Sequence, residues 1–81
     1  MDKHIIVGVH IVDREEHAPL VQQIFTTYGS QIRTRLGLHD DVCASNGLIL
    51  LEMADSPETV EMISAIEAIE GVDVGKMAFA H

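Results

Sequence analysis

A histidine and a cysteine four residues apart are the side chains of this sequence best suited to holding a metal. His39 and Cys43 enclose Asp40 and Asp41, and imidazole, thiolate and carboxylate groups are ligands of zinc, nickel or copper. A structural metal site needs three or four ligands, so another histidine would have to join through folding or from a second subunit. A solvated loop is the simpler interpretation. We therefore expect no cofactor, with a transition metal such as nickel or zinc at His39 and Cys43 as the alternative.

A second candidate site is the polar segment that follows the first apolar stretch. Asp13, Arg14 and His17 stand where a strand is expected to pass into a helix, and a helix N-terminus offers unpaired backbone N–H groups to an anionic ligand. The guanidinium of Arg14 could hold a carboxylate through two hydrogen bonds. Capping of the helix by Asp13, with Glu16 three residues on as in a capping box, explains the same segment without a ligand and is favoured.

Two arginines form a third candidate. Arg33 and Arg35 alternate with apolar residues over 32–38, which predicts a strand with both arginines on one polar face. They could bind an anion. Pairing with Glu52 on a neighbouring strand, or with acidic groups of another subunit, is the favoured interpretation.

No set of residues meets the geometric requirements of a catalytic site. A nucleophilic cysteine needs a formed pocket and a lowered pKa, and the loop that carries Cys43 is short. The glycines do not form a phosphate-binding motif. We expect a protein that is not an enzyme, with a small dimeric enzyme of ferredoxin-like fold as the lesser alternative.

Length and charge limit the partners. The 81 residues form one domain, 1–81, and five basic residues against thirteen acidic ones give a net charge of −8. Such a chain is poorly suited to nucleic acid or to an anionic membrane surface. It has no apolar run of membrane-spanning length and no apparent signal peptide, and Cys43 is its single cysteine. We expect a cytoplasmic protein.

Periodicity and turn signals predict the element order β-α-β-β-α-β. Strands are expected over 3–12, 32–38, 48–53 and 72–79. The first helix is expected to start near Glu16 or His17, because Pro19 is best tolerated in a first turn, and to end at Gly29 in a left-handed cap.

The second helix is expected to begin at the segment DSPE. Asp55 or Ser56 would cap it, Pro57 would occupy its first turn, and Gly71 would follow its end. Its expected buried stripe contains five residues at helical spacing: Val60, Met62, Ile63, Ile66 and Ile69.

This order predicts an α+β fold, a ferredoxin-like βαββαβ sandwich with a four-stranded antiparallel sheet and both helices on one face. The first and third strands would be central, since both are apolar at odd and even positions. The other face of the sheet would then be open to solvent. We expect a homodimer or a homotetramer that covers it, with an interface at Ile6, Val12, Leu48 and Leu50.

Several short motifs carry a family resemblance. They are Tyr28-Gly29, Ile32-x-x-Arg35-Leu36-Gly37-Leu38, the opening IIVGVHIVDREEHAP and the closing AIEGVDVGKMA. Together they resemble the iron-only hydrogenase system regulators, which are short, stand-alone ACT-like domains. The resemblance implies a ferredoxin-like fold, oligomeric assembly and a regulatory role near hydrogenase genes. We expect a module that acts by binding a small ligand or a protein partner, with a metal sensor that uses His39 and Cys43, or a purely structural interaction subunit, as the alternatives. The sequence departs from the family in 39–43, where HDDVC replaces a more basic stretch that contains proline.

Overall fold

Four strands and two helices follow one another along the part of the chain that the structure describes. The structure is a computed structural model, and it describes residues 3–38 and 42–80. The elements are β1 (Lys3–Ile11), α1 (Arg14–Thr27), β2 (Ile32–Leu38), β3 (Gly47–Met53), α2 (Pro57–Glu67) and β4 (Val72–Ala80). A short 3-10 turn over Gly29–Gln31 precedes β2. The predicted order β-α-β-β-α-β is confirmed.

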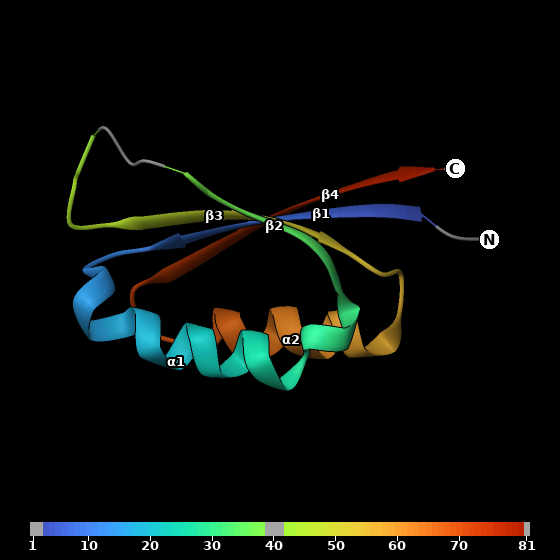
Figure 1. Cartoon of the computed structure of the whole chain (residues 1–81), viewed down its shortest axis with the longest axis horizontal. Coiled ribbons are helices and arrows are strands. Elements are labelled where there is room, and N and C mark those ends of the chain that lie inside the picture. Colours follow the sequence, from blue (N-terminus) through green and yellow to red (C-terminus); the bar gives the residue numbers. More distant parts are fainter. Residues whose placement is uncertain (1–2, 39–41, 81) are drawn as a thin grey trace.

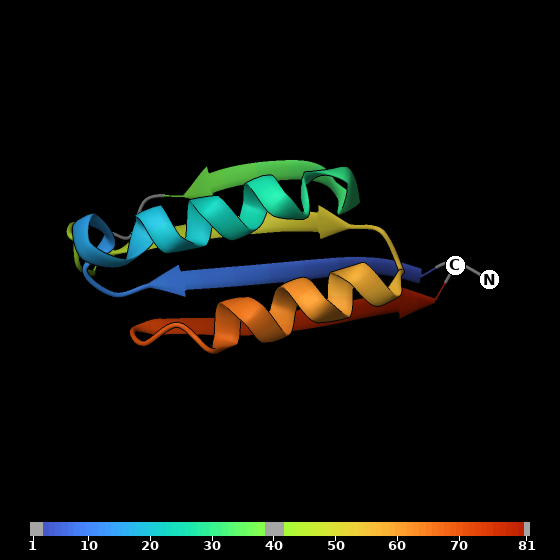
Figure 2. The same ribbon diagram turned by 90° about the horizontal axis from the view of Figure 1, so that it is seen from below.

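The strands form an antiparallel sheet in the order β2-β3-β1-β4. Both helices lie against the same side of this sheet (Figure 1). Seen from the helical side, α1 runs along the half formed by β2 and β3, and α2 along the half formed by β1 and β4 (Figure 2). The architecture is a ferredoxin-like α+β fold, with β1 and β3 central as predicted.

The core lies between the sheet and the helices. Every second residue of β1, from Ile5 to Ile11, is buried, and so are Leu51 and Met53 on β3. The helices contribute Val21, Phe25, Met62 and Ile66, each at most 3% exposed. Because successive side chains of a strand point to opposite faces, the remaining residues of β1 and β3 point away from the helices. The apolar side chains among them therefore lie outside this core.

Helix α2 begins where the sequence predicts, but the face that it buries differs from the predicted one. The hydroxyl of Ser56 accepts a hydrogen bond from the backbone N–H of Thr59 at 3.2 Å, and Pro57 occupies the first turn. Val60, which was expected in the buried stripe, is 60% exposed, and Thr59 is 3% exposed in its place. The hydroxyl of Thr59 donates to the backbone carbonyl of Ala54 at 2.6 Å. This hydrogen bond compensates for burying a polar group and lets Thr59 face the sheet.

The ends of α1 differ from the prediction. The helix begins at Arg14, two residues earlier than expected, so that Pro19 lies inside it. Asp13 adopts a left-handed conformation (φ 51°), and its side chain makes no capping hydrogen bond. Its backbone carbonyl instead accepts from the N–H groups of Glu16 and His17. At the other end Gly29 opens the 3-10 turn and is not a left-handed cap, whereas Gly71 has a positive φ of 82°.

Within residues 3–38 and 42–80, neither helix combines the length and the apolar character that crossing a bilayer requires.

Candidate functional site

The side of the sheet that faces away from the helices is the candidate site, and we call it the open face. Residues paired in register share a face of the sheet, so the pairs that contain the unburied residues of β1 define the open face. Its side chains come from all four strands: Thr34, Leu36 and Leu38 on β2, Leu48, Leu50 and Glu52 on β3, His4, Ile6, Gly8 and His10 on β1, and Asp73, Gly75, Met77 and Phe79 on β4.

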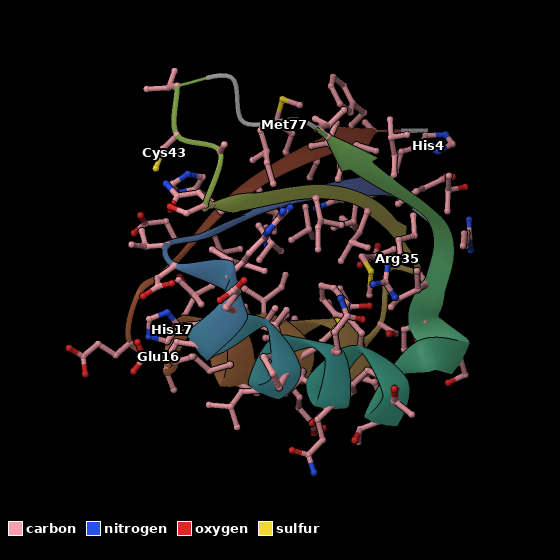
Figure 3. All side chains as sticks on the ribbon, turned by 60° about the vertical axis from the view of Figure 1, so that its left-hand side comes forward. His4, Glu16, His17, Arg35, Cys43 and Met77 are labelled. Carbon is pink, nitrogen blue, oxygen red and sulfur yellow. The ribbon has the colours of Figure 1, made fainter. Side chains whose placement is uncertain are left out.

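Apolar side chains dominate the open face. Leu36, Leu38, Leu50, Met77 and Phe79 are between 36% and 56% exposed. Met77 projects from the sheet away from the helices (Figure 3). The leucines lie side by side on the paired strands β2 and β3, Met77 and Phe79 lie on β4, and Ile6 of β1 lies between the two groups. Together they make the open face more apolar than a protein exterior with scattered apolar residues.

The four residues expected at an oligomer interface lie on or beside this face. Ile6 and Leu48 are half-buried by their neighbours on the sheet, and Leu50 is 36% exposed. Val12 is 43% exposed and follows the last register pair of β1, so it borders the open face. Their role in an interface stays a prediction.

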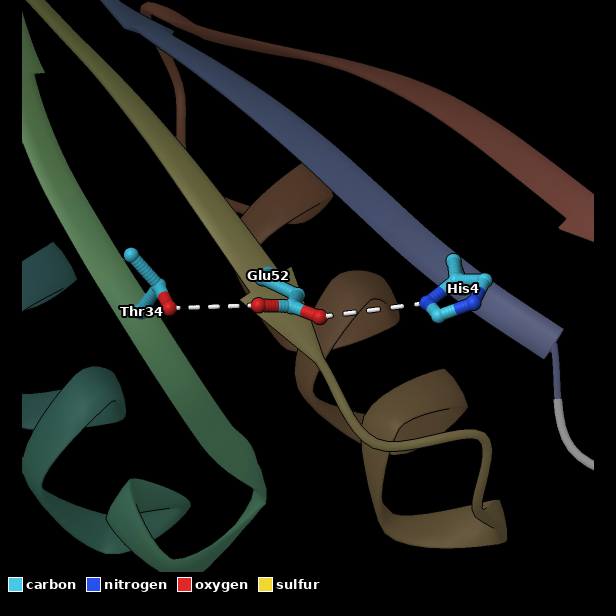
Figure 4. Close-up of polar contacts among 3 residues, drawn as sticks. All are labelled: His4, Thr34 and Glu52. Atoms are coloured by element: carbon cyan, nitrogen blue, oxygen red, sulfur yellow. Dashed lines mark hydrogen bonds and ion pairs between the residues drawn. The ribbon is translucent and has the colours of Figure 1, made fainter.

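A short polar chain crosses one end of the open face. The hydroxyl of Thr34 donates to Oε1 of Glu52 at 3.1 Å, and Nδ1 of His4 lies 4.0 Å from Oε2 of the same carboxylate (Figure 4). Glu52 therefore links the strands on both sides of β3. The expected pairing of Glu52 with Arg33 and Arg35 is wrong.

The arginines are displaced by an irregularity in β2. Ile32 pairs with Met53 and Thr34 pairs with Glu52, so the register shifts between Ile32 and Thr34 and leaves Arg33 as the extra residue of a bulge. The bulge exchanges the two faces of β2 beyond it.

As a result, Arg35 lies on the helical side of the sheet, opposite the buried Leu51. Its guanidinium lies 5.0 Å from the centre of the Phe25 ring and donates to Oε1 of Gln22 on α1 at 2.6 Å. Arg35 points from the sheet towards α1 in Figure 3. Arg35 joins β2 to α1, and the two arginines do not form a common anion site.

The segment between β1 and α1 is held by contacts within the chain. The backbone N–H of Asp13 donates to Oδ1 of Asn46 at 3.0 Å, and that of Arg14 donates to the carbonyl of Ser45 at 2.9 Å. Nδ1 of His17 lies 2.5 Å from the carbonyl oxygen of Val12, so this nitrogen carries the proton and donates.

These contacts leave little at this helix end for an anion to bind. The N–H groups of Asp13, Arg14 and Glu16 are already bonded, and Glu15 and Glu16 place negative charge in the first turn. A ligand at Asp13, Arg14 and His17 stays a prediction.

The metal hypothesis falls partly outside the described residues, because His39 is not among them. Cys43 is exposed, and its sulfur lies 3.2 Å from the hydroxyl of Ser45. Over 3–38 and 42–80, no group of three or more histidine, cysteine and acidic side chains is placed to hold a metal ion. The described residues also enclose no pocket. A metal at His39 and Cys43 stays a prediction.

Comparisons with known proteins identify the fold. No family model matches the chain, and no curated protein matches it. Among solved structures, the uncharacterized protein TM1266 from Thermotoga maritima superposes with a TM-score of 0.85 at 18% identity, over 99% of this chain and all of that one. The chain therefore shares its ferredoxin-like fold with TM1266 over nearly its whole length.

Two other similar structures have assigned activities. SnoaB, a cofactor-independent oxygenase from Streptomyces nogalater, has a TM-score of 0.59 at 10% identity, covering 100% of this chain and 94% of that one. A formyltetrahydrofolate deformylase from Pseudomonas putida has a TM-score of 0.61 at 12% identity, and the match spans 96% of this chain and only 29% of that one. At such identities the likeness establishes the ferredoxin-like α+β fold and carries no activity over to this chain.

Proposed function

We propose that this protein is a small regulatory module that associates with further copies of itself through the open face and serves an iron-only hydrogenase system. The open apolar face is the observation that carries the assembly. The motifs shared with the iron-only hydrogenase system regulators support the hydrogenase role, and the likeness to TM1266 over 99% of this chain supports the ferredoxin-like fold. The assembly is a homodimer or a homotetramer in the cytoplasm.

The open face reaches the minimum size of a specific contact between two copies. β1 and β4 each contain nine residues, so the sheet is about 30 Å long and about 19 Å wide at the usual rise and strand spacing. Because β2 and β3 are shorter, at seven residues each, the open face covers roughly 500 Å² on each copy, and two copies would bury roughly 1,000 Å². A biological interface should bury about 1,000 Å² or more, and interfaces below about 1,200 Å² belong to the weaker class, so the open face stands at the lower limit.

Regulation in this proposal depends on a protein partner or a small ligand that the assembled form binds. A net charge of −8 makes direct contact with the nucleic-acid backbone unfavourable. A transcriptional effect would therefore pass through another protein.

Two leucines with the same exposure test the assembly. Leu36 on the open face and Leu20 on α1 are each 52% exposed, so Leu36→Glu and Leu20→Glu add the same charge to equally exposed positions. Light scattering at micromolar concentration should give the natural chain and Leu20→Glu at least twice the 8.9 kDa of one copy. Leu36→Glu should approach the mass of one copy, because its carboxylate would be buried in the contact.

A natural chain that is monomeric across the micromolar range would contradict the proposal. Equal dissociation of both variants would contradict the assignment of the contact to the open face. The regulatory role is tested separately by deleting the gene in its own host. Hydrogenase transcript and activity that match those of the parent strain would refute the link to the hydrogenase system.

A further inference from the structure

Across its middle row, the open face has a leucine half and a glycine half, while Met77 and Phe79 stand on β4 in the rows beyond Gly75. Its middle row crosses the four strands through Leu36, Leu50, Gly8 and Gly75, because Leu36 pairs with Leu50, Leu50 with Gly8, and Gly8 with Gly75. Bulky side chains therefore occupy β2 and β3 in this row, and bare main chain occupies β1 and β4.

The residues of this row differ strongly in how far they project from the sheet. Leu36 is 52% exposed. A Cβ atom placed on Gly75 would meet nothing within 4 Å, whereas one placed on Gly8 would meet Leu50 Cδ2 at 3.5 Å. Leu50 thus leans over Gly8, and the main chain at Gly75 stays uncovered at the edge of the sheet.

Two glycines paired inside strands need a physical reason. Glycine weakens a strand because it loses more backbone entropy on folding and brings no side chain to pack, and it often marks a place where another chain approaches closely. Neither glycine has a positive φ, so no unusual backbone conformation requires it. The uncovered main chain at Gly75 matches the leucine that projects on the opposite side of the same row.

We propose that two copies pack open face against open face about a two-fold axis that runs along the strands, between β1 and β3. This rotation places β2 of one copy over β4 of the other and keeps the middle row facing itself. Leu36 of each copy then covers Gly75 of the other, and Leu50 lies beside the axis near Gly8 of the other. This inference rests on the proposed function, since it specifies the geometry of that assembly.

The alternative two-fold axis in the plane of the sheet runs across the strands and fits poorly. It places each strand over the same strand of the other copy, so that Leu36 meets Leu36 and Gly75 meets Gly75. The leucines would hold the sheets apart where the glycines would leave a gap, and an unfilled gap forfeits dispersion contacts. The rotation along the strands lets both halves of each face make contact.

Cysteine cross-linking distinguishes these two arrangements. In a Cys43→Ala background, which removes the exposed natural thiol, we would compare Leu36→Cys, Gly75→Cys and the double variant, each treated with a short bismaleimide. The proposed axis predicts covalent dimer from the double variant and little from either single variant. Within one chain the two positions are three strand spacings apart, about 14 Å, so a shorter reagent does not join them.

Each other outcome has a separate meaning. Covalent dimer from Leu36→Cys alone or Gly75→Cys alone would overturn the proposed axis in favour of the one across the strands. No covalent dimer from any variant, while light scattering shows dimers, would also overturn it and leave the proposed function intact. A Cys43→Ala chain that is monomeric by light scattering would refute the proposed function itself.

Moving the bulky side chain from β2 to β4 tests the same geometry without a cross-linking reagent. Gly75→Leu should weaken the dimer at least tenfold, and circular dichroism should show an intact fold, because the space around Gly75 is open. Adding Leu36→Ala to Gly75→Leu moves the bulky group from β2 to β4 and should restore most of the association. A combined variant as dissociated as Gly75→Leu alone would overturn the inference.

Discussion

The substitution Gly71→Ala tests which contacts hold the segment between β1 and α1. Gly71 has a φ of 82°, and its carbonyl accepts a hydrogen bond from the N–H of Val12 at 2.7 Å. A Cβ atom on Gly71 would lie 2.8 Å from Cε1 and 3.0 Å from Nδ1 of the His17 ring. The alanine would therefore be strained twice, by its backbone conformation and by the imidazole.

The expected cost follows from these two causes. A left-handed conformation costs an L-residue about 1–2 kcal/mol. Moving the ring of His17 would break its hydrogen bond to Val12, which contributes about 1 kcal/mol. Together these give about 2–3 kcal/mol, against a total stability of about 4–12 kcal/mol for a domain of this size.

Urea unfolding followed by circular dichroism measures this loss, at one protein concentration because self-association adds to stability. With a slope near 1 kcal/mol per molar urea, the midpoint should fall by about 2–3 M. Gly29→Ala is the control, since Gly29 has no positive φ and its Cβ would meet nothing within 4 Å. In a His17→Ala background, Gly71→Ala should cost only the conformational part, about 1–2 kcal/mol. A loss below about 0.5 kcal/mol in the natural background would refute the reasoning.

Three further outcomes are expected. Leu36→Ala should raise the dissociation constant of the dimer about 30-fold, because half of a leucine's burial, about 1 kcal/mol, is lost from each copy; sedimentation should show no such change for Leu20→Ala. Ser56→Ala should lower the free energy of unfolding by about 1–2 kcal/mol in urea, since it removes the cap of α2 and a 2.6 Å hydrogen bond to Gln31; an unchanged midpoint would contradict this. Arg35→Gln should cost about 1 kcal/mol through loss of its contacts with α1, whereas Arg33→Gln should stay within about 0.5 kcal/mol, and equal losses would contradict the bulge assignment.

The sequence by itself determined the order of the elements and the places of the central strands. A strand that is apolar at both odd and even positions is stable only when both of its faces are covered. This pattern predicted that β1 and β3 lie in the middle of the sheet. The start of α2 was equally local, because Ser56 and Pro57 act on their own turn.

Some predictions were wrong because the outcome depended on contacts between elements, which local sequence patterns do not describe. Capping was predicted for Asp13 from its neighbours, yet Asn46 on a distant loop binds its backbone N–H. Val60 was expected in the core, yet the orientation of α2 against the sheet buries Thr59, whose hydroxyl finds a carbonyl partner five residues back. In each case a contact within the folded chain outweighed a local preference.

Only the tertiary structure decided which side chains share the open face. One extra residue at Arg33 reverses the faces of β2, so Leu36 and Leu38 point outward and Arg35 points to α1. The alignment of Leu36, Leu50, Gly8 and Gly75 across four strands depends on three registers at once. Successive side chains of a strand alternate between its two faces, so a register shift of one residue exchanges the faces. The alternation of apolar and polar residues in the sequence does not show where such a shift occurs.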